Sequence, residues 1–273
     1  MNKKLICSLG ATLILGVAGS VNAAQYSWSF TSTAPSSGGS HVVAPTGVVS
    51  GSYDGFARYT TEYQSMTYVS NGQSVNIQGF ANTASGSTIE RAYLNYQGSS
   101  GLGMTSRDTS SNDEVNSSGY ANGGNGQHSL DNVGAIEAML FSFGPDLSVN
   151  LVDIGWWTND SDITLYAYTG ASVADINSTV LGKTFSTLTG WTKVGEFPGN
   201  DDPRITNNST YSRYWLVTPG ASSDSKSDYI KLAGIAGSTK PTTPPPAVPE
   251  PASLALIGTA LAGMIAVRRR KAA

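Results

Sequence analysis

Cysteine and histidine are nearly absent from this chain of 273 residues, which contains one Cys and two His. The cysteine, Cys7, lies in an N-terminal apolar run that we expect to be removed on export. Structural zinc sites, iron–sulfur clusters and thiol catalysis need such side chains, so the sequence almost excludes them. The mature chain should also lack disulfides, and a domain of this size can bury a large enough core without them.

Charged residues are scarce as well, at 13% of the chain, and the formal net charge is -3. Six of the 16 basic residues lie in the two terminal segments, at Lys3, Lys4, Arg268, Arg269, Arg270 and Lys271. The region between them is therefore more acidic than the whole-chain net charge suggests. Nucleic acid is a poor partner for such a surface, whereas hydrated cations and neutral polysaccharide are compatible with it.

The N-terminal segment has the three parts of a secretory signal peptide. Two lysines are followed by an apolar run from Leu5 to Ala18 and by small residues that end at Ala23. We expect a signal peptide over residues 1–23, with cleavage between Ala23 and Ala24, and an exported protein. The alternative is an uncleaved anchor, but the apolar run is short for a membrane span.

The body of the chain shows short apolar segments between turns rich in Gly, Ser and Asn, with almost no helical periodicity. We predict an all-β fold, a jelly-roll-like antiparallel β-sandwich over residues 24–237. The candidate strands are Tyr26–Phe30, Tyr59–Val69, Val75–Ala81, Ile89–Tyr96, Ile136–Phe143, Val149–Trp157, Ile163–Tyr168, Trp191–Phe197, Tyr214–Val217 and Tyr229–Ala233.

Two of these segments are apolar on both faces. In Ile136–Phe143, Ala138 and Leu140 fall on one side, while Met139 and Phe141 fall on the other. Val149–Trp157 has a similar pattern. A strand buried on both faces lies in the middle of a sheet and under a second layer, so we expect both segments at the centre of the fold.

The C-terminal region has three dissimilar parts. Residues 238–251 are a Pro/Thr-rich linker that should be extended. Residues 252–267 are apolar or small, and we expect them to form a single helix. Residues 268–273 are a basic tail. At about 1.5 Å per residue, the helix reaches roughly 24 Å and spans a hydrocarbon layer of about 30 Å only marginally. The cations should stay in the cytoplasm, which favours a stop-transfer segment. A plain permanent anchor is the alternative, but it does not explain the Pro-Glu-Pro sequence.

This tail resembles the PEP-CTERM sorting signal of Gram-negative, biofilm-forming bacteria. The matching residues are Val248, Pro249, Glu250, Pro251 and Ala252, the apolar run, and the basic stop at Arg268, Arg269, Arg270 and Lys271. The resemblance implies an exosortase as the processing partner and a transient stay in the inner membrane. It also implies a mature form on the cell surface or in the extracellular matrix, and it specifies an address rather than an activity.

The body resembles an exosortase-dependent surface-protein family of the XDP1 type. The similar stretches are "GLGMTSRD", "HSLDNVGAIEAMLFSF", "IGWWTNDSDITLYAYTG", "GWTKVGEF" and "YWLV", between residues 101 and 217. That family supplies no established enzymatic activity, so the resemblance implies a surface role alone.

Acidic residues in the turns raise the question of a metal site. Asp131 and Asn132 precede a buried strand, and Asp160 and Asp162 lie in the turn between two strands. Acidic loops of β-sandwiches supply the oxygen ligands that calcium prefers. We hypothesise one structural Ca²⁺ held by Asp131, Asn132 and one of Asp160 or Asp162. The simpler interpretation, which we favour, is that these residues form turns.

Aromatic side chains raise the question of a sugar site. Trp156 and Trp157 are adjacent in a strand and must point to opposite faces, so one of them should be exposed. An exposed aromatic ring could stack on a sugar, as could Trp191, Tyr166, Tyr168 and Tyr214. Core packing is the alternative, because Trp is usually mostly buried.

Signatures of catalysis are missing, and we predict no catalytic residue. The chain has no Gly-x-Ser-x-Gly nucleophile elbow. His128 stands three residues before Asp131, but we favour a turn there over half of a triad. We therefore expect a non-catalytic surface or matrix protein associated with exopolysaccharide or biofilm. The alternatives are a carbohydrate-binding module on the cell surface and a secreted hydrolase.

Overall fold

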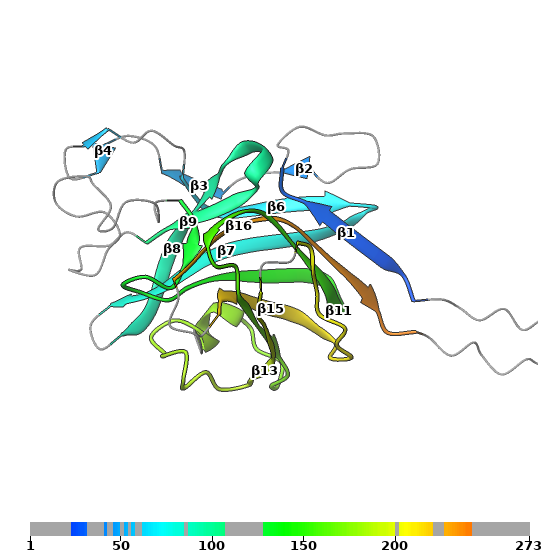
Figure 1. Ribbon diagram of the computed structural model, residues 1–273. Coiled ribbons are helices and arrows are strands. Elements are labelled where there is room, and N and C mark those ends of the chain that lie inside the picture. Colours follow the sequence, from blue (N-terminus) through cyan, green and yellow to red (C-terminus); the bar gives the residue numbers. More distant parts are fainter. Residues whose placement is uncertain are drawn as a thin grey trace, which may run out of the picture. The chain divides into compact units, whose positions relative to one another are not determined.

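Sixteen β-strands and two short 3₁₀ helices form the described part of the chain in the computed structural model (Figure 1). The structure describes residues 23–31, 41–42, 46–49, 52–53, 56–57, 62–84, 87–106, 128–199, 202–220 and 227–241. The chain divides into one unit of residues 23–240 and another made of residues 1–22 and 241–273. The predicted signal peptide up to residue 22, the Pro-rich segment from residue 242, the apolar helix and the basic tail lie outside the described residues.

The elements run along the chain as follows: β1 (Gln25–Ser29), β2 (His41–Val42), β3 (Thr46–Val49), β4 (Ser52–Tyr53), β5 (Phe56–Ala57), β6 (Glu62–Ser70), β7 (Gln73–Ala84), β8 (Thr88–Tyr96), η1 (Gly98–Ser100), β9 (Leu102–Thr105), β10 (Leu130–Asp131), β11 (Glu137–Asn159), β12 (Ile163–Tyr168), η2 (Ile176–Thr179), β13 (Trp191–Phe197), β14 (Arg204–Ile205), β15 (Ser212–Pro219) and β16 (Asp228–Thr239). The predicted all-β fold is confirmed, and β12 and β13 match their predicted strands to the residue.

The main sheet has 14 strands, and its named strands pair antiparallel. The strand order is β1-β16-β9-β8-β6-β7-β11-β15-β12-β13, with β10, β14, β2 and β3 attached beside it. Further pairings of β16 with β11 and of β7 with β8 close a circuit β11–β16–β9–β8–β7–β11. The sheet therefore folds back on itself and encloses a core.

The long strand β11 makes this possible because it belongs to two layers. Its first half, Glu137–Phe143, lies between β7 and β15, whereas residues from Leu147 to Asn159 pair with β16. The register shifts between Ser142 and Leu147, where the chain contains Gly144 and Pro145. Proline and glycine are typical of a bend in a strand, since they weaken the ladder.

Two hydrophobic cores lie on opposite faces of the first half of β11. Met139 and Phe141 join the larger core, which lies inside the folded sheet. Leu140 joins a smaller core with Ile176 and Val180, contributed by η2 and the residues after it. The expectation that this segment is buried on both faces is confirmed.

The second half of β11 differs from that expectation. Val152 and Ile154 are fully buried, but Trp157 is 39% exposed and Trp156 is half-buried. The smaller core covers the first half of β11 through Ala138 and Leu140 and does not reach this end. The prediction of burial on both faces was wrong here, because no second layer in the described part of the chain covers the outer face.

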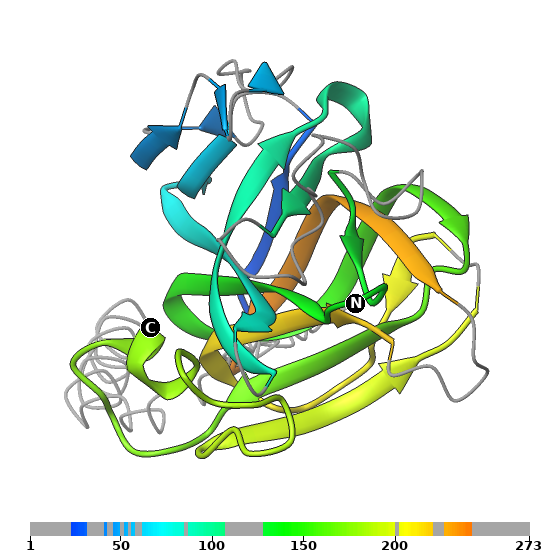
Figure 2. The same ribbon diagram turned by 90° about the vertical axis from the view of Figure 1, so that its left-hand side faces the viewer.

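The two ends of the body meet at one sheet edge. β1 pairs with β16 in the register Gln25 to Ser238, and the two strands lie side by side in both ribbon views (Figure 2). The Ala24 amide donates to Thr239 Oγ1 at 3.1 Å, and the Thr239 amide donates to Ala24 O at 3.0 Å. β16 thus extends past the predicted body boundary at residue 237.

Candidate functional site

An open cavity of about 410 Å³ lies where β12 ends, β15 begins and β11 bends. Its lining is more polar than apolar. The bend of β11 contributes Asp146, the end of β12 and the following loop contribute four residues, and β15 with the residue before it contributes four. The lining residues are Asp146, Tyr168, Thr169, Gly170, Ser172, Tyr211, Ser212, Arg213 and Tyr214.

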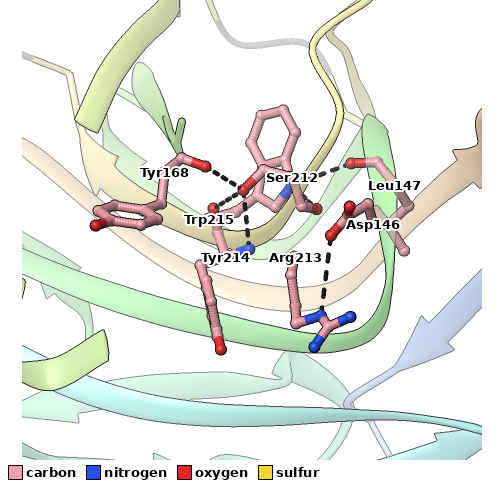
Figure 3. Close-up of polar contacts among 7 residues, drawn as sticks. All are labelled: Asp146, Leu147, Tyr168, Ser212, Arg213, Tyr214 and Trp215. Atoms are coloured by element: carbon pink, nitrogen blue, oxygen red, sulfur yellow. Dashed lines mark hydrogen bonds and ion pairs between the residues drawn. The ribbon is translucent and has the colours of Figure 1, made fainter. Parts of the chain in front are cut away.

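A hydrogen-bond network around Ser212 joins these elements (Figure 3). The Ser212 hydroxyl lies 2.7 Å from Tyr168 O, to which it donates, and it accepts from the Tyr214 amide at 3.0 Å. The Trp215 indole donates to Leu147 O at 3.2 Å and to Ser212 O at 3.0 Å. Because Ser212 is buried and its hydroxyl is already hydrogen-bonded, its role is to fix the strand ends rather than to meet a ligand.

The Tyr168 ring forms a fixed wall of the cavity. Its hydroxyl donates to Ala171 O at 2.8 Å, and its ring meets the Tyr214 ring edge-on at a centroid distance of 6.3 Å. A Cβ added to Gly170 would lie 2.9 Å from Tyr168 Cζ, and a Cβ added to Gly190 would lie 2.7 Å from Tyr168 Cε2. Only glycine leaves room for the ring at these two positions.

The rim carries a loose ion pair. Arg213 Nε lies 3.8 Å from Asp146 Oδ1, and their side chains are 53% and 67% exposed (Figure 3). Within the described part of the chain, neither side chain makes a further hydrogen bond or ion pair. A guanidinium offers five N–H donors and a carboxylate several acceptor positions, so most of this capacity remains open to water or to a ligand.

The predicted tryptophans do not line this cavity. Trp157 is the exposed member of the pair, as the strand alternation requires, and Trp156 lies under Lys231, whose Nζ is 4.4 Å from the ring centroid. Trp191 is 9% exposed and belongs to the smaller core. Of the predicted aromatic residues, Tyr168 and Tyr214 reach the cavity, and Tyr211 was missed.

A second polar cluster brings together three buried carboxylates. Asp160 and Asp162 lie in the turn between β11 and β12, and Asp228 begins β16. One carboxylate oxygen from each lies within 4.8 Å of the others. Asn132 Nδ2 donates to Asp228 Oδ2 at 2.7 Å, and Asn132 Oδ1 accepts from the Asp228 amide at 3.0 Å.

The electrostatics of this cluster disfavour three ionised carboxylates. Burial raises the pKa of Asp228 from 3.8 to about 7, and repulsion from Asp162 and Asp160 adds to the rise. Hydrogen bonds from the Asp162 amide, at 2.9 Å, and from Asn132 oppose it. A divalent cation between the carboxylates would relieve the same repulsion.

The structure therefore assembles part of the predicted calcium set. Asn132, Asp160 and Asp162 lie together with Asp228, which was not predicted. Three carboxylates are fewer than the six to eight oxygens that calcium takes, so carbonyls or water would have to complete its shell. Arg204 donates to Ser161 O at 3.0 Å, so one cationic group already lies beside the turn. The calcium hypothesis stays a prediction.

Asp131 has a different environment from the other predicted ligands. Its carboxylate accepts from the Val133 amide at 2.9 Å, as in a turn, and its own amide donates to Glu137 Oε2 at 3.1 Å. Burial, followed by the charge of Asp131, raises the pKa of Glu137 well above its usual value.

His128 was considered in the sequence analysis as half of a triad with Asp131. Its Nδ1 lies 3.2 Å from Thr105 Oγ1.

Comparison with known proteins identifies the tail. Residues 247–271 match the family model described as the PEP-CTERM protein-sorting motif. This match includes Val248–Ala252 and Arg268–Lys271, and it marks an exported protein with a membrane-anchored precursor that an exosortase processes. No curated protein and no solved structure matches the chain. Within the ranges described by the structure, no helix is both long and apolar enough to cross a membrane.

Proposed function

We propose that the chain is a non-catalytic protein of the cell surface or extracellular matrix, and that its folded body associates with exopolysaccharide. The observation that carries this proposal is the sorting motif at residues 247–271, which addresses the protein to an exosortase after export. An extracellular location suits a body whose mature form contains no cysteine and therefore no redox-sensitive thiol.

The cavity supports a binding role over a hydrolytic one. Among its described lining residues there is one carboxylate, Asp146, and no histidine. Glycoside hydrolysis by the common mechanism uses two carboxylates, and a serine nucleophile needs a base beside it. The hydroxyl of Ser212 is held by the backbone of Tyr168 and Tyr214 instead. The lining thus offers contacts for a ligand without a catalytic pair.

The sorting step is tested on the protein recovered from its native cells. We expect the intact mass and the C-terminal peptide to show a mature chain that ends near Pro249–Pro251, found outside the inner membrane. A variant with alanine at Pro249, Glu250 and Pro251 is the matched control and should remain full length. A wild-type chain that keeps residues 252–273 and stays in the inner membrane would refute the proposal.

The association with polysaccharide needs a separate measurement. In cells that make exopolysaccharide, the mature protein should sediment with the matrix, and it should appear in the medium when polysaccharide synthesis is blocked. Equal distribution in the two strains would contradict the matrix role while leaving the sorting step intact.

A further inference from the structure

We propose that the cavity between β12 and β15 binds a neutral saccharide. The inference rests on the proposed function, because it names the site through which the body would hold a polysaccharide. The cavity volume of about 410 Å³ falls in the range of roughly 300–1,000 Å³ that is typical of small-ligand sites. Its lining is more polar than apolar, which favours a ligand rich in hydroxyl groups over an apolar one.

Aromatic rings supply the stacking surface. Tyr168, Tyr211 and Tyr214 line the cavity and are half-buried, so each presents part of its ring to the open space. The C–H groups on one face of a pyranose ring pack well against such a surface. Tyr168 is already immobilised by its bond to Ala171 O and by the close approach of Gly170. Little conformational entropy is then lost when a ring stacks on it.

Planar polar groups beside the rings supply hydrogen bonds. The carboxylate of Asp146 can accept from adjacent sugar hydroxyls, and the guanidinium of Arg213 can donate to them, since their mutual contact of 3.8 Å is loose. Hydrogen bonds with charged partners are stronger than those between neutral groups. The two groups therefore give orientation and specificity to a ligand that the tyrosines hold.

The charges of the rim favour a neutral sugar over an acidic one. Asp146 offsets the charge of Arg213, so the pair attracts anions weakly. The body around it has an excess of acidic residues, which repels an anionic polymer such as a polyuronate. A neutral polysaccharide is not repelled in this way.

The test is a titration of the full-length chain with neutral oligosaccharides of glucose, mannose and galactose, followed by calorimetry and ligand-observed NMR. The detergent must carry no sugar headgroup, since that group would compete. We expect at least one series to bind. The double variant Asp146→Ala/Arg213→Ala should bind it about 10- to 100-fold more weakly, because two charge-assisted contacts are lost. Its melting temperature should be unchanged, since both side chains are exposed.

Matched controls separate the cavity from the rest of the surface. Lys193 and Glu196 form another exposed ion pair, on β13 and outside the cavity, so Lys193→Ala/Glu196→Ala should bind like the wild type. Tyr211→Phe should keep binding because the ring remains, whereas Tyr211→Ala should weaken it. Trp157→Ala should have no effect.

The inference would be overturned if no neutral saccharide binds, or if only uronic-acid oligosaccharides bind. It would also be overturned if the Lys193/Glu196 control loses binding equally, or if Trp157→Ala abolishes binding. Binding of a synthetic peptide of residues 240–251 in place of any saccharide would also overturn it, because tyrosine-lined grooves can capture Pro-rich peptides. Tail processing plays no part in this assay, so a failure of the sorting proposal and a failure of the saccharide site give different patterns.

Discussion

The stability of the metal-free protein should fall as the pH rises from about 4 to about 7, because of Asp228. Asp228 is 1% exposed, and its carboxylate lies close to those of Asp160 and Asp162. Burial is the main reason that its pKa is about 7 in the folded chain, against an ordinary value of 3.8. Between these two values the folded state holds a proton that the unfolded state has released. Each rise in pH across this window therefore lowers the free energy of unfolding.

The size of the effect follows from the difference between the two pKa values. About three pKa units at roughly 1.36 kcal/mol each give a loss of about 4 kcal/mol at most, complete above pH 7. For a domain of this size, 1 kcal/mol shifts the melting temperature by roughly 2–4 °C, so a drop on the order of 10 °C is expected. The loss should level off above pH 7, where Asp228 is ionised in both states.

The assay is thermal and urea unfolding in EDTA at several pH values from 5 to 8, for the wild type and for Asp228→Asn. The variant loses the hydrogen bond from Asn132 and will be less stable overall, so the readout is the slope against pH rather than the absolute stability. The buried Glu137 and the half-buried Asp153 have raised pKa values too, and subtracting the variant's profile removes their share. Identical slopes for both proteins would refute the reasoning.

Calcium gives a linked expectation at the same cluster. If an ion replaces the proton, millimolar Ca²⁺ at pH 7.5 should raise the melting temperature of the wild type above its value in EDTA. Asp228→Asn and Asp162→Asn should reduce that gain. An unchanged melting temperature would remove the calcium hypothesis and would leave the pH dependence of the metal-free protein as it stands.

Five further substitutions probe packing and burial. Glu137→Gln should flatten the decline of the free energy of unfolding with rising pH, because burial raises the pKa of this carboxyl well above its usual value and glutamine does not titrate; urea unfolding at several pH values from 5 to 9, compared with the wild type, checks this. Trp215→Phe should cost about 2–4 kcal/mol, since the N–H of this fully buried indole is shared between two backbone carbonyls, while Trp157→Phe on the surface should cost less than about 1 kcal/mol; equal costs would contradict the burial assignment. Gly101→Ala should cost more than about 2 kcal/mol, because the φ of Gly101 is +88° and a Cβ there would collide with a backbone carbonyl. Gly72 has a similar φ of +74° but open space around it, so Gly72→Ala should cost about 1 kcal/mol. Calorimetric melting of both variants checks the difference.

The fold class could be predicted because the strand pattern is local. The segment Ile136–Phe143 has apolar residues on both of its faces, and the structure places Leu140 in one core and Phe141 in the other. The same pattern near Trp157 misled the prediction, because apolar residues on both faces do not reveal whether a second layer extends over them. That depends on η2 and the residues after it, which follow β12 in the chain and cover the first half of β11 alone.

The candidate sites were harder to predict because their members are distant in sequence. Asn132 and Asp228 are hydrogen-bonded across a separation of 96 residues, and no spacing rule joins them. Asp160 and Asp162 could be found as a pair because they share one turn. The carboxylate of Asp131, adjacent to Asn132, accepts from the Val133 amide, and its role as a metal ligand stays a prediction.

The cavity that we propose to bind a saccharide shows the same limitation. Tryptophan is the strongest aromatic signal in a sequence, so the prediction centred on Trp156 and Trp157. The cavity is instead lined by tyrosines from β12 and from the start of β15, and by Asp146 from the bend in β11. A bend that contains Gly144 and Pro145 could have drawn attention to Asp146, because residues at strand bends are often exposed.

The paired strands β1 and β16 begin and end the folded body, between the two terminal signals along the chain. Cleavage after Ala23 would leave Ala24 free to keep both of its contacts with Thr239, and removal of the tail would begin beyond the last strand. The two terminal signals can therefore be removed without breaking a single strand of the sheet. The cavity depends on β11, β12 and β15, which take no part in either cleavage. Removal of both terminal segments would therefore leave intact the cavity that we propose to bind a saccharide.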